Sequence, residues 1–282
     1  MATINPYSSG LDPSVEKAIQ NLAENFYKNY VVKEGLNVGE LIDEIITLLK
    51  IDVFYFDFEQ PEASGKPIKG IYLRSNNLQE KSHKFVIHKN DSVKTQNFTI
   101  VHELFHHLLM EDQSSELAQL LANEDMLERA GDYFAACLLM DAKKFIMHFD
   151  FLQKTYSSKE QFDFEKIVFK LSDAFITPYE SVVRRLAETE LLKDEQVHLL
   201  ECKEDEFIQR REAIMGPTVL DSPSQKAVFQ PYVNLIVKGL KNKDLSYMDA
   251  IKRLNRVNPK RAQMIEAEYL AKLATLEDDE EG

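Results

Sequence analysis

The sequence is short of cysteine, of long apolar runs and of positive charge. Two cysteines, Cys137 and Cys202, in 282 residues are too few for the disulfide framework of a small secreted domain, and Cys137 is expected to be a core residue. No stretch approaches the roughly 18 apolar residues of a transmembrane helix, and the first residues lack the basic-then-apolar pattern of a signal peptide. We therefore expect a cytoplasmic protein without a membrane-spanning segment.

Acidic residues outnumber basic ones by 47 to 34, which gives a net charge of −13. Because an acidic surface repels phosphate, non-specific binding to nucleic acid is not expected. Such a surface suits a basic protein partner, although ordinary solubility requires acidic residues as well. The chain, with 44% hydrophobic residues, has the composition of a globular protein and the length for one large or two modest domains.

The main functional pattern is an HExxH motif, formed by His102, Glu103 and His106 within the apolar run 98–110. Positions four apart share one face of a helix, so the two histidines can hold one metal ion through their ring nitrogens. Glu103 lies on the adjoining surface, where it can act as the general base of a hydrolase. An amphipathic helix with a chance polar stripe is the competing interpretation. It is disfavoured because a buried helix has little reason to hold imidazoles and a carboxylate unless they are paired or bind metal.

The third metal ligand has to come from another segment, because a catalytic zinc usually has three protein ligands and one open position. A third histidine shortly after the motif is absent, since the next histidine outside this helix is His148. The helical segment 124–140 offers Glu128 instead, with Asp132 four residues later on the same face. We expect Glu128 to be the ligand, with Glu124 as its rival, and Asp132 to fix the tautomer of a ligand histidine.

Three blocks of the chain match one family in combination and in order. They read FTIVHELFHHLL at 98–109, ERAGDYFAACLLM at 128–140 and LSDAFITPYESVVRRL at 171–186. They resemble the patterns FTxAHELGHxxL, ExEANxFAAxLLMP and LAxxFxVSxxAVxxRL of the ImmA/IrrE family of bacterial metallopeptidases. Together with the preceding strands, the resemblance covers about residues 15–190.

This sequence departs from the family patterns at three positions. Phe105 replaces a usual Gly, Ala130 a usual Glu and Asp141 a usual Pro. The resemblance implies a zinc-dependent, site-specific endopeptidase that cleaves a helix-turn-helix transcriptional repressor in mobile-element or stress-response control. The alternative is a non-proteolytic regulator that docks such a repressor through its helical C-terminal region.

The hydrophobic pattern predicts an α+β fold that is mainly helical. Helical periodicity covers 12–31 and 37–50, and strand-forming residues dominate 51–58, 68–74 and 84–88. We expect a small three-stranded sheet, antiparallel or mixed, to pack on the HExxH helix, followed by a helical C-terminal region. An exposed edge of this sheet could pair with an extended substrate peptide, although the sheet could also serve packing alone.

Four regions are predicted: a zinc metallopeptidase-like domain over 1–141, a helical region over 142–215, a C-terminal helical region over 216–276 and an acidic tail over 277–282. Within the second region, residues 172–186 suggest a helix-turn-helix arrangement whose second helix has only Arg184 and Arg185 as basic residues. A recognition helix normally carries more, so we expect packing or partner docking rather than DNA binding. The acidic tail is expected to be disordered, and 216–223 is the expected linker.

Several other residues carry minor predictions. Thr177 is expected to cap a helix that begins at Pro178. His107 should point away from the two ligand histidines and pack, and His88 should lie at the surface. Tyr133 is expected in the core, although a hydroxyl there could also donate to an oxyanion.

Overall fold

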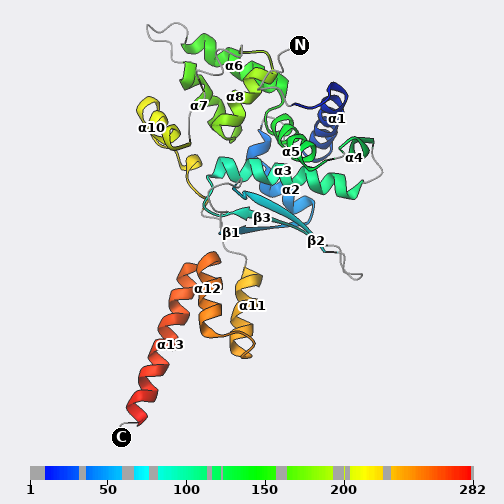
Figure 1. Cartoon of the computed structure of the whole chain (residues 1–282). Coiled ribbons are helices and arrows are strands. Elements are labelled where there is room, and N and C mark those ends of the chain that lie inside the picture. The colour runs from blue at the N-terminus through cyan, green and yellow to red at the C-terminus, as the bar shows by residue number, and fades with distance from the viewer. Residues whose placement is uncertain are drawn as a thin grey trace.

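The computed structural model describes residues 10–31, 36–58, 67–75, 82–112, 116–121, 123–156, 164–192, 200, 204–224 and 230–280. Its helices surround a three-stranded sheet, which confirms the predicted α+β, mainly helical class. Figure 1 shows the sheet between two groups of helices, with α3 and the helices packed around it on one side and the C-terminal helices on the other.

The first helices begin and end at local signals in the sequence. Helix α1 (Pro13–Tyr30) starts after Asp12, whose carboxylate accepts a hydrogen bond from the Ser14 amide at 2.8 Å. The helix predicted over 37–50 is instead a short 3₁₀ turn, η1 (Val38–Glu40), followed by α2 (Ile42–Leu48). Lys50 has a φ of 55°, a left-handed conformation that separates α2 from the first strand.

The sheet contains β1 (Ile51–Phe56), β2 (Gly70–Ser75) and β3 (Ser82–His88), in the order β1-β3-β2. The central strand β3 runs parallel to β1 and antiparallel to β2, so the sheet is mixed. Phe85 and Ile87 of β3 are fully buried, and α3 packs on β2 and β3. Strand β2 therefore forms the edge of the sheet on the side where the HExxH helix crosses it.

The core of the molecule is the crossing of α3 (Val93–Glu111) and α5 (Glu124–Leu139), with the short α4 (Glu116–Leu120) between them in sequence. Phe105 of α3 and Phe134 of α5 are both fully buried, and their ring centroids lie 5.5 Å apart. Helix α1 covers the other side of α5. The side chain of Phe105 thus fills volume at this crossing that the family's usual glycine would leave empty.

The next three helices are α6 (Ala142–Tyr156), α7 (Phe164–Phe175) and α8 (Tyr179–Glu188). The turn between α7 and α8 lies where we predicted it, but the capping prediction is wrong. Pro178, not Thr177, occupies the cap position, and its side chain makes no capping hydrogen bond. Thr177 is fully buried, and its hydroxyl donates a hydrogen bond to the sulfur of Met140 at 3.6 Å. The loop between α7 and α8 therefore packs against the end of α5.

The segment predicted as a linker is packed onto the HExxH helix. It follows α10 (Glu204–Ile214) and includes a 3₁₀ turn, η2 (Val219–Asp221), while the Val93 amide donates to the Ser222 carbonyl at 2.9 Å. Lys94, only 1% exposed, contacts Asp173 of α7 at 2.7 Å and Asp221 at 2.8 Å. A buried ammonium group is costly unless it is paired with carboxylates. The ion pair between Lys94 and Asp221 therefore holds the segment 216–223 against α3.

Three helices close the chain, namely α11 (Gln230–Lys241), α12 (Tyr247–Val257) and α13 (Pro259–Glu280). They have a hydrophobic cluster of their own, formed by Val233, Ile236, Ala250, Leu254, Val257, Ala262 and Ile265. Phe56 at the end of β1 packs against this cluster. Helix α13 continues to Glu280, so the described part of the acidic tail is helical rather than disordered. The four region boundaries remain predictions.

None of the helices in the described part of the chain combines the length and apolar character that crossing a bilayer requires. Cys202 and most of the turn predicted at 60–67 lie outside the described residues.

Candidate metal centre

Helix α3 brings the two motif histidines together on one face. The helix starts after Ser92, whose hydroxyl accepts a hydrogen bond from the Thr95 amide at 3.2 Å. His102 and His106 follow one turn apart, and their Nε2 atoms lie 3.1 Å from each other. Two nitrogens that bind one tetrahedral zinc at about 2.0–2.1 Å are separated by about 3.3 Å. The spacing of the two rings therefore fits a shared metal ion.

Helix α5 supplies the carboxylate that completes the group. Oε2 of Glu128 lies 3.3 Å from Nε2 of His102, and Oε1 lies 3.5 Å from Nε2 of His106. Each of the three residues offers a ligand atom within 4.8 Å of the other two, and no second group of this kind occurs among the described residues. Two imidazole nitrogens and a carboxylate are a donor set that zinc accepts, and three protein ligands leave a coordination position open.

Glu124, the rival of Glu128 in the sequence, is not in this group. It is the first residue of α5 and is exposed. Four residues along a helix correspond to about 6 Å, so Glu124 is displaced along α5 from the point where this helix crosses α3. The geometry favours Glu128, while its role as a metal ligand stays a proposal.

Asp132 lies behind His102, on the side of the ring away from Glu128. Its Oδ1 is 3.0 Å from Nδ1 of His102. Nδ1 can then donate to the carboxylate, which leaves the lone pair of Nε2 directed toward the metal position. The other oxygen, Oδ2, is 3.8 Å from Nη1 of Arg184 on α8. We did not anticipate this arginine contact, because only the packing of α8 brings Arg184 there.

Electrostatics make the two histidines unequal. Burial alone would lower the pKa of His102, but the hydrogen bonds that its ring donates to the carboxylates of Asp132 and Glu128 outweigh burial and raise that pKa to about 10. Burial lowers the pKa of His106 to about 4, and the charge of His102 adds to the effect. His106 is therefore neutral at pH 7, whereas a metal ion bound here would have to displace a proton from His102.

Glu103 is buried beside the edge strand rather than within the metal group. It is 7% exposed, and burial raises the pKa of its carboxyl group to about 7, although the charge of His102 and a hydrogen bond from the Tyr72 amide act in the opposite direction. Strand β2 approaches so closely that a Cβ atom on Gly70 would lie 2.8 Å from Oε1 of Glu103. A carboxyl group with a pKa near neutrality suits the transfer of protons in both directions.

The remaining histidines and Tyr133 lie outside the group of three. His107 turns to the sheet, and its ring centroid is 4.5 Å from that of His83, a neighbour that sequence reasoning missed. The hydroxyl of Tyr133 accepts from Nε2 of Gln20 at 2.7 Å, as expected of a core tyrosine at the α1 contact. The surface prediction for His88 is wrong, because the ring of Phe58 stacks on its imidazole and the residue is only 9% exposed.

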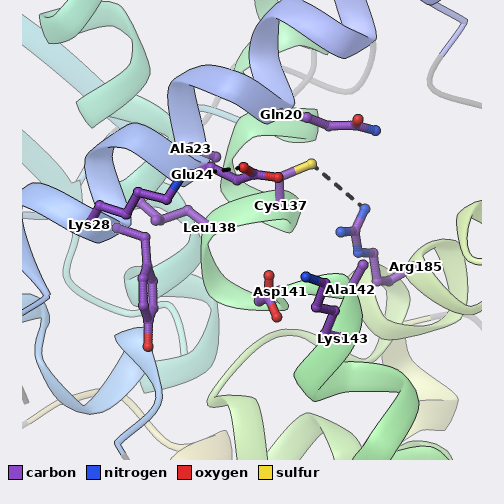
Figure 2. A pocket seen from close by; sticks show the side chains of 11 residues that line it. Gln20, Ala23, Glu24, Lys28, Cys137, Leu138, Asp141, Ala142, Lys143 and Arg185 are labelled. Atoms are coloured by element: carbon purple, nitrogen blue, oxygen red, sulfur yellow. Dashed lines mark hydrogen bonds and ion pairs between the residues drawn. The ribbon is translucent and has the colours of Figure 1, made fainter. Parts of the chain in front are cut away.

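A separate cavity of about 410 Å³ lies between α1, the end of α5 and α8 (Figure 2). Cys137 points into it, 3.7 Å from Nη1 of Arg185, which also contacts Glu188 at 3.0 Å. Burial raises the pKa of the Cys137 thiol despite the neighbouring guanidinium group. A raised pKa disfavours the thiolate, in agreement with the structural role expected of Cys137.

The search of curated proteins found no match. One similar solved structure is a Mycobacterium tuberculosis transcriptional regulator, with 16% identity and a TM-score of 0.38 over 61% of this chain and 46% of that one. This chain thus covers less than half of that regulator's length. The family model for the IrrE N-terminal-like domain matches residues 47–187, half of the chain, which includes both helices of the metal centre. The chain therefore belongs to this peptidase family, Peptidase M78.

Proposed function

We propose that this protein is a zinc-dependent endopeptidase that cuts a DNA-binding repressor protein at a specific site. The observation that carries the proposal is the convergence of His102, His106 and Glu128 at one point, with the buried carboxyl group of Glu103 beside it. These residues come from two helices that cross in the core, so their positions are held by packing.

His102, His106 and Glu128 would hold the metal, and Asp132 would orient His102. Zinc bound there supplies a Lewis acid that polarises the scissile carbonyl and makes water more acidic. Glu103 takes the proton of the attacking water and passes it to the leaving amine. Its burial beside Gly70 holds the carboxyl group next to the two histidines, where one group can perform both transfers.

The edge strand β2 is the part of the fold best placed to orient a substrate. The Tyr72 amide already reaches Glu103, so the backbone of β2 runs directly past the proposed base. An extended peptide that adds to this edge would bring its scissile bond alongside α3. The Arg74→Pro variant removes the backbone N–H two residues after Tyr72, which an added peptide strand would need as a hydrogen-bond donor, and should therefore lower cleavage. Arg74→Ala is the matched control, because it removes the same side chain and keeps the N–H. Equal activity of the two variants would contradict strand addition.

The proposal that the substrate is a repressor rests on the family resemblance and not on residues of the site. The two arginines of α8 do not support DNA binding by this protein itself. Arg185 is buried with Glu188, and Arg184 contacts Asp132. The protein would then act on a DNA-binding partner, in mobile-element or stress-response control and in the cytoplasm where such partners work.

The experiment that tests the function is a comparison of protein N-termini in cells that express either the wild type or the Glu103→Gln variant. We expect one or a few new N-termini, within a DNA-binding repressor, only in the wild-type sample. A repressor whose output changes equally in both samples would instead support the non-proteolytic docking alternative. Identical N-termini together with unchanged repressor output would contradict both.

A further inference from the structure

A second hollow is lined by residues of β1, α11 and α12. These C-terminal helices lie on the side of the sheet away from α3 (Figure 1). The volume of the hollow is about 430 Å³, which lies within the range of small-molecule sites. It is lined by Phe56, Tyr232, Asp249, Lys252, Arg253 and Arg256. None of these residues belongs to the metal centre, so the hollow needs an explanation of its own.

The wall formed by α12 is basic. Lys252 and Arg256 are four residues apart and share one face of the helix, and Arg253 lies beside them. Neither Lys252 nor Arg253 has an acidic partner among the residues that the structure describes. The stretch 230–261 contains eight Lys or Arg residues and two Asp residues, although the whole chain has a net charge of −13. The C-terminal helices are thus locally basic, and three of these cations line the hollow.

The one acidic residue in the lining is already engaged. Oδ2 of Asp249 accepts a hydrogen bond from the Ser246 hydroxyl at 2.7 Å, and that hydroxyl accepts one from the Asp249 amide at 3.1 Å. This reciprocal arrangement caps the N-terminus of α12. Asp249 therefore has a structural role at the helix end, and among the described residues it forms no ion pair with Lys252 or Arg253.

The other two lining residues are aromatic. Phe56 ends β1, and the guanidinium carbon of Arg256 lies 6.0 Å from the centre of its ring. Tyr232 of α11 lines the hollow beside it. Aromatic faces favour the stacking of a planar heterocycle, whereas Lys and Arg favour phosphate oxygens. A ligand with a planar ring and a phosphate group would contact both the aromatic and the basic residues.

We propose that this hollow binds a nucleoside phosphate, with its base against Phe56 and Tyr232 and its phosphates on Lys252, Arg253 and Arg256. The volume of the hollow is large enough for one mononucleotide. The site lies at the junction of the sheet and the C-terminal helices, and a bound nucleotide bridges the two.

Calorimetric titration of the full-length protein with ATP tests the proposal. The double variant Lys252→Gln/Arg253→Gln should weaken ATP binding by about tenfold or more, because it removes the charged donors of hydrogen bonds to the phosphates, and such bonds are stronger than neutral ones. The matched control is Lys238→Gln/Lys241→Gln, which removes the same charge from exposed positions of α11 outside the hollow. We expect the control to bind ATP within about twofold of the wild type.

Further probes separate the two walls. Phe56→Leu should weaken ATP binding and leave the weak binding of inorganic phosphate unchanged, with circular dichroism to confirm that each variant is folded. Absence of ATP binding at millimolar concentration would overturn the proposal, and so would an equal loss in the two double variants, which would indicate general electrostatic attraction. Binding of a short DNA duplex that ATP does not displace would overturn it in favour of a nucleic-acid surface.

Discussion

Nδ1 of His102 lies 3.0 Å from Oδ1 of Asp132, across the contact between α3 and α5. Because this carboxylate can hold the ring in one tautomer, we propose that Asp132 orients His102 for metal binding without itself contacting the metal. We expect Asp132→Ala to weaken zinc affinity by roughly 10- to 100-fold, measured by competition with a chelator. Asp132→Asn, which keeps an acceptor at the same position, should recover part of the loss. Wild-type affinity in Asp132→Ala would contradict this role.

The third ligand can be identified by metal analysis of purified variants. Wild-type protein should contain one zinc ion per chain, and both His102→Ala and Glu128→Ala should lose it, because a two-ligand site binds zinc weakly. Glu124→Ala is the control, since it removes a carboxylate from the same helix outside the group of three. Retention of zinc by Glu128→Ala, with loss in Glu124→Ala, would reverse the assignment.

Glu103→Gln should separate metal binding from catalysis. The amide cannot take up a proton, so cleavage of the identified repressor should fall by at least about 100-fold, while mass spectrometry should still detect one zinc ion per chain. Glu111→Gln on the same helix is the control, because Glu111 lies toward Arg74 and His83 and away from the metal group. An active Glu103→Gln enzyme would remove Glu103 from the mechanism.

The buried ion pairs around Lys94 predict a specific acid sensitivity. Burial alone would raise the pKa of Asp173, but hydrogen bonds from Arg211 and Lys94 and their charges lower it. Because the folded pKa is depressed, the stabilisation is complete above the ordinary value near 4 and is lost as the pH falls through the folded value. The unfolding free energy of the wild type, measured in urea, should therefore fall below about pH 4.

Asp173→Asn should remove that part of the pH dependence and lower stability at neutral pH, since Lys94 would lose one of its two carboxylates. Asp150→Asn is the control, because Asp150 is exposed on α6 and should leave the acid limb unchanged. If the acid limb of Asp173→Asn coincides with that of the wild type, the ion pairs do not contribute as described.

Phe105 provides a test of packing at the metal centre. It is fully buried against Phe134, so Phe105→Ala should reduce the free energy of unfolding by about 3–5 kcal/mol through the cavity it leaves. Phe151→Ala, at a side chain that is 66% exposed, should change it by no more than about 0.5 kcal/mol. Thermal unfolding of the two variants compares them directly, and equal shifts would contradict a packing role for Phe105.

Local patterns in the sequence were enough to predict the elements that carry the site. The HExxH spacing requires only that residues 102–106 form a helix, and the pair Glu128 and Asp132 requires only that α5 is helical. The three strands before α3 and the mainly helical class followed from periodicity in the same way. These features depend on neighbours within about four residues, so the chain specifies them without knowledge of the rest of the fold.

Tertiary structure decided what depends on distant segments. The crossing of α3 and α5 brings Glu128, and not Glu124, next to the two histidines. The packing of α8 brings Arg184 to Asp132, and the edge strand buries Glu103. The segment after α10 has the composition of a linker, yet the buried ammonium group of Lys94 holds it against the HExxH helix. Such contacts join residues far apart in sequence, and their energies depend on burial and on partner geometry, which no local pattern encodes.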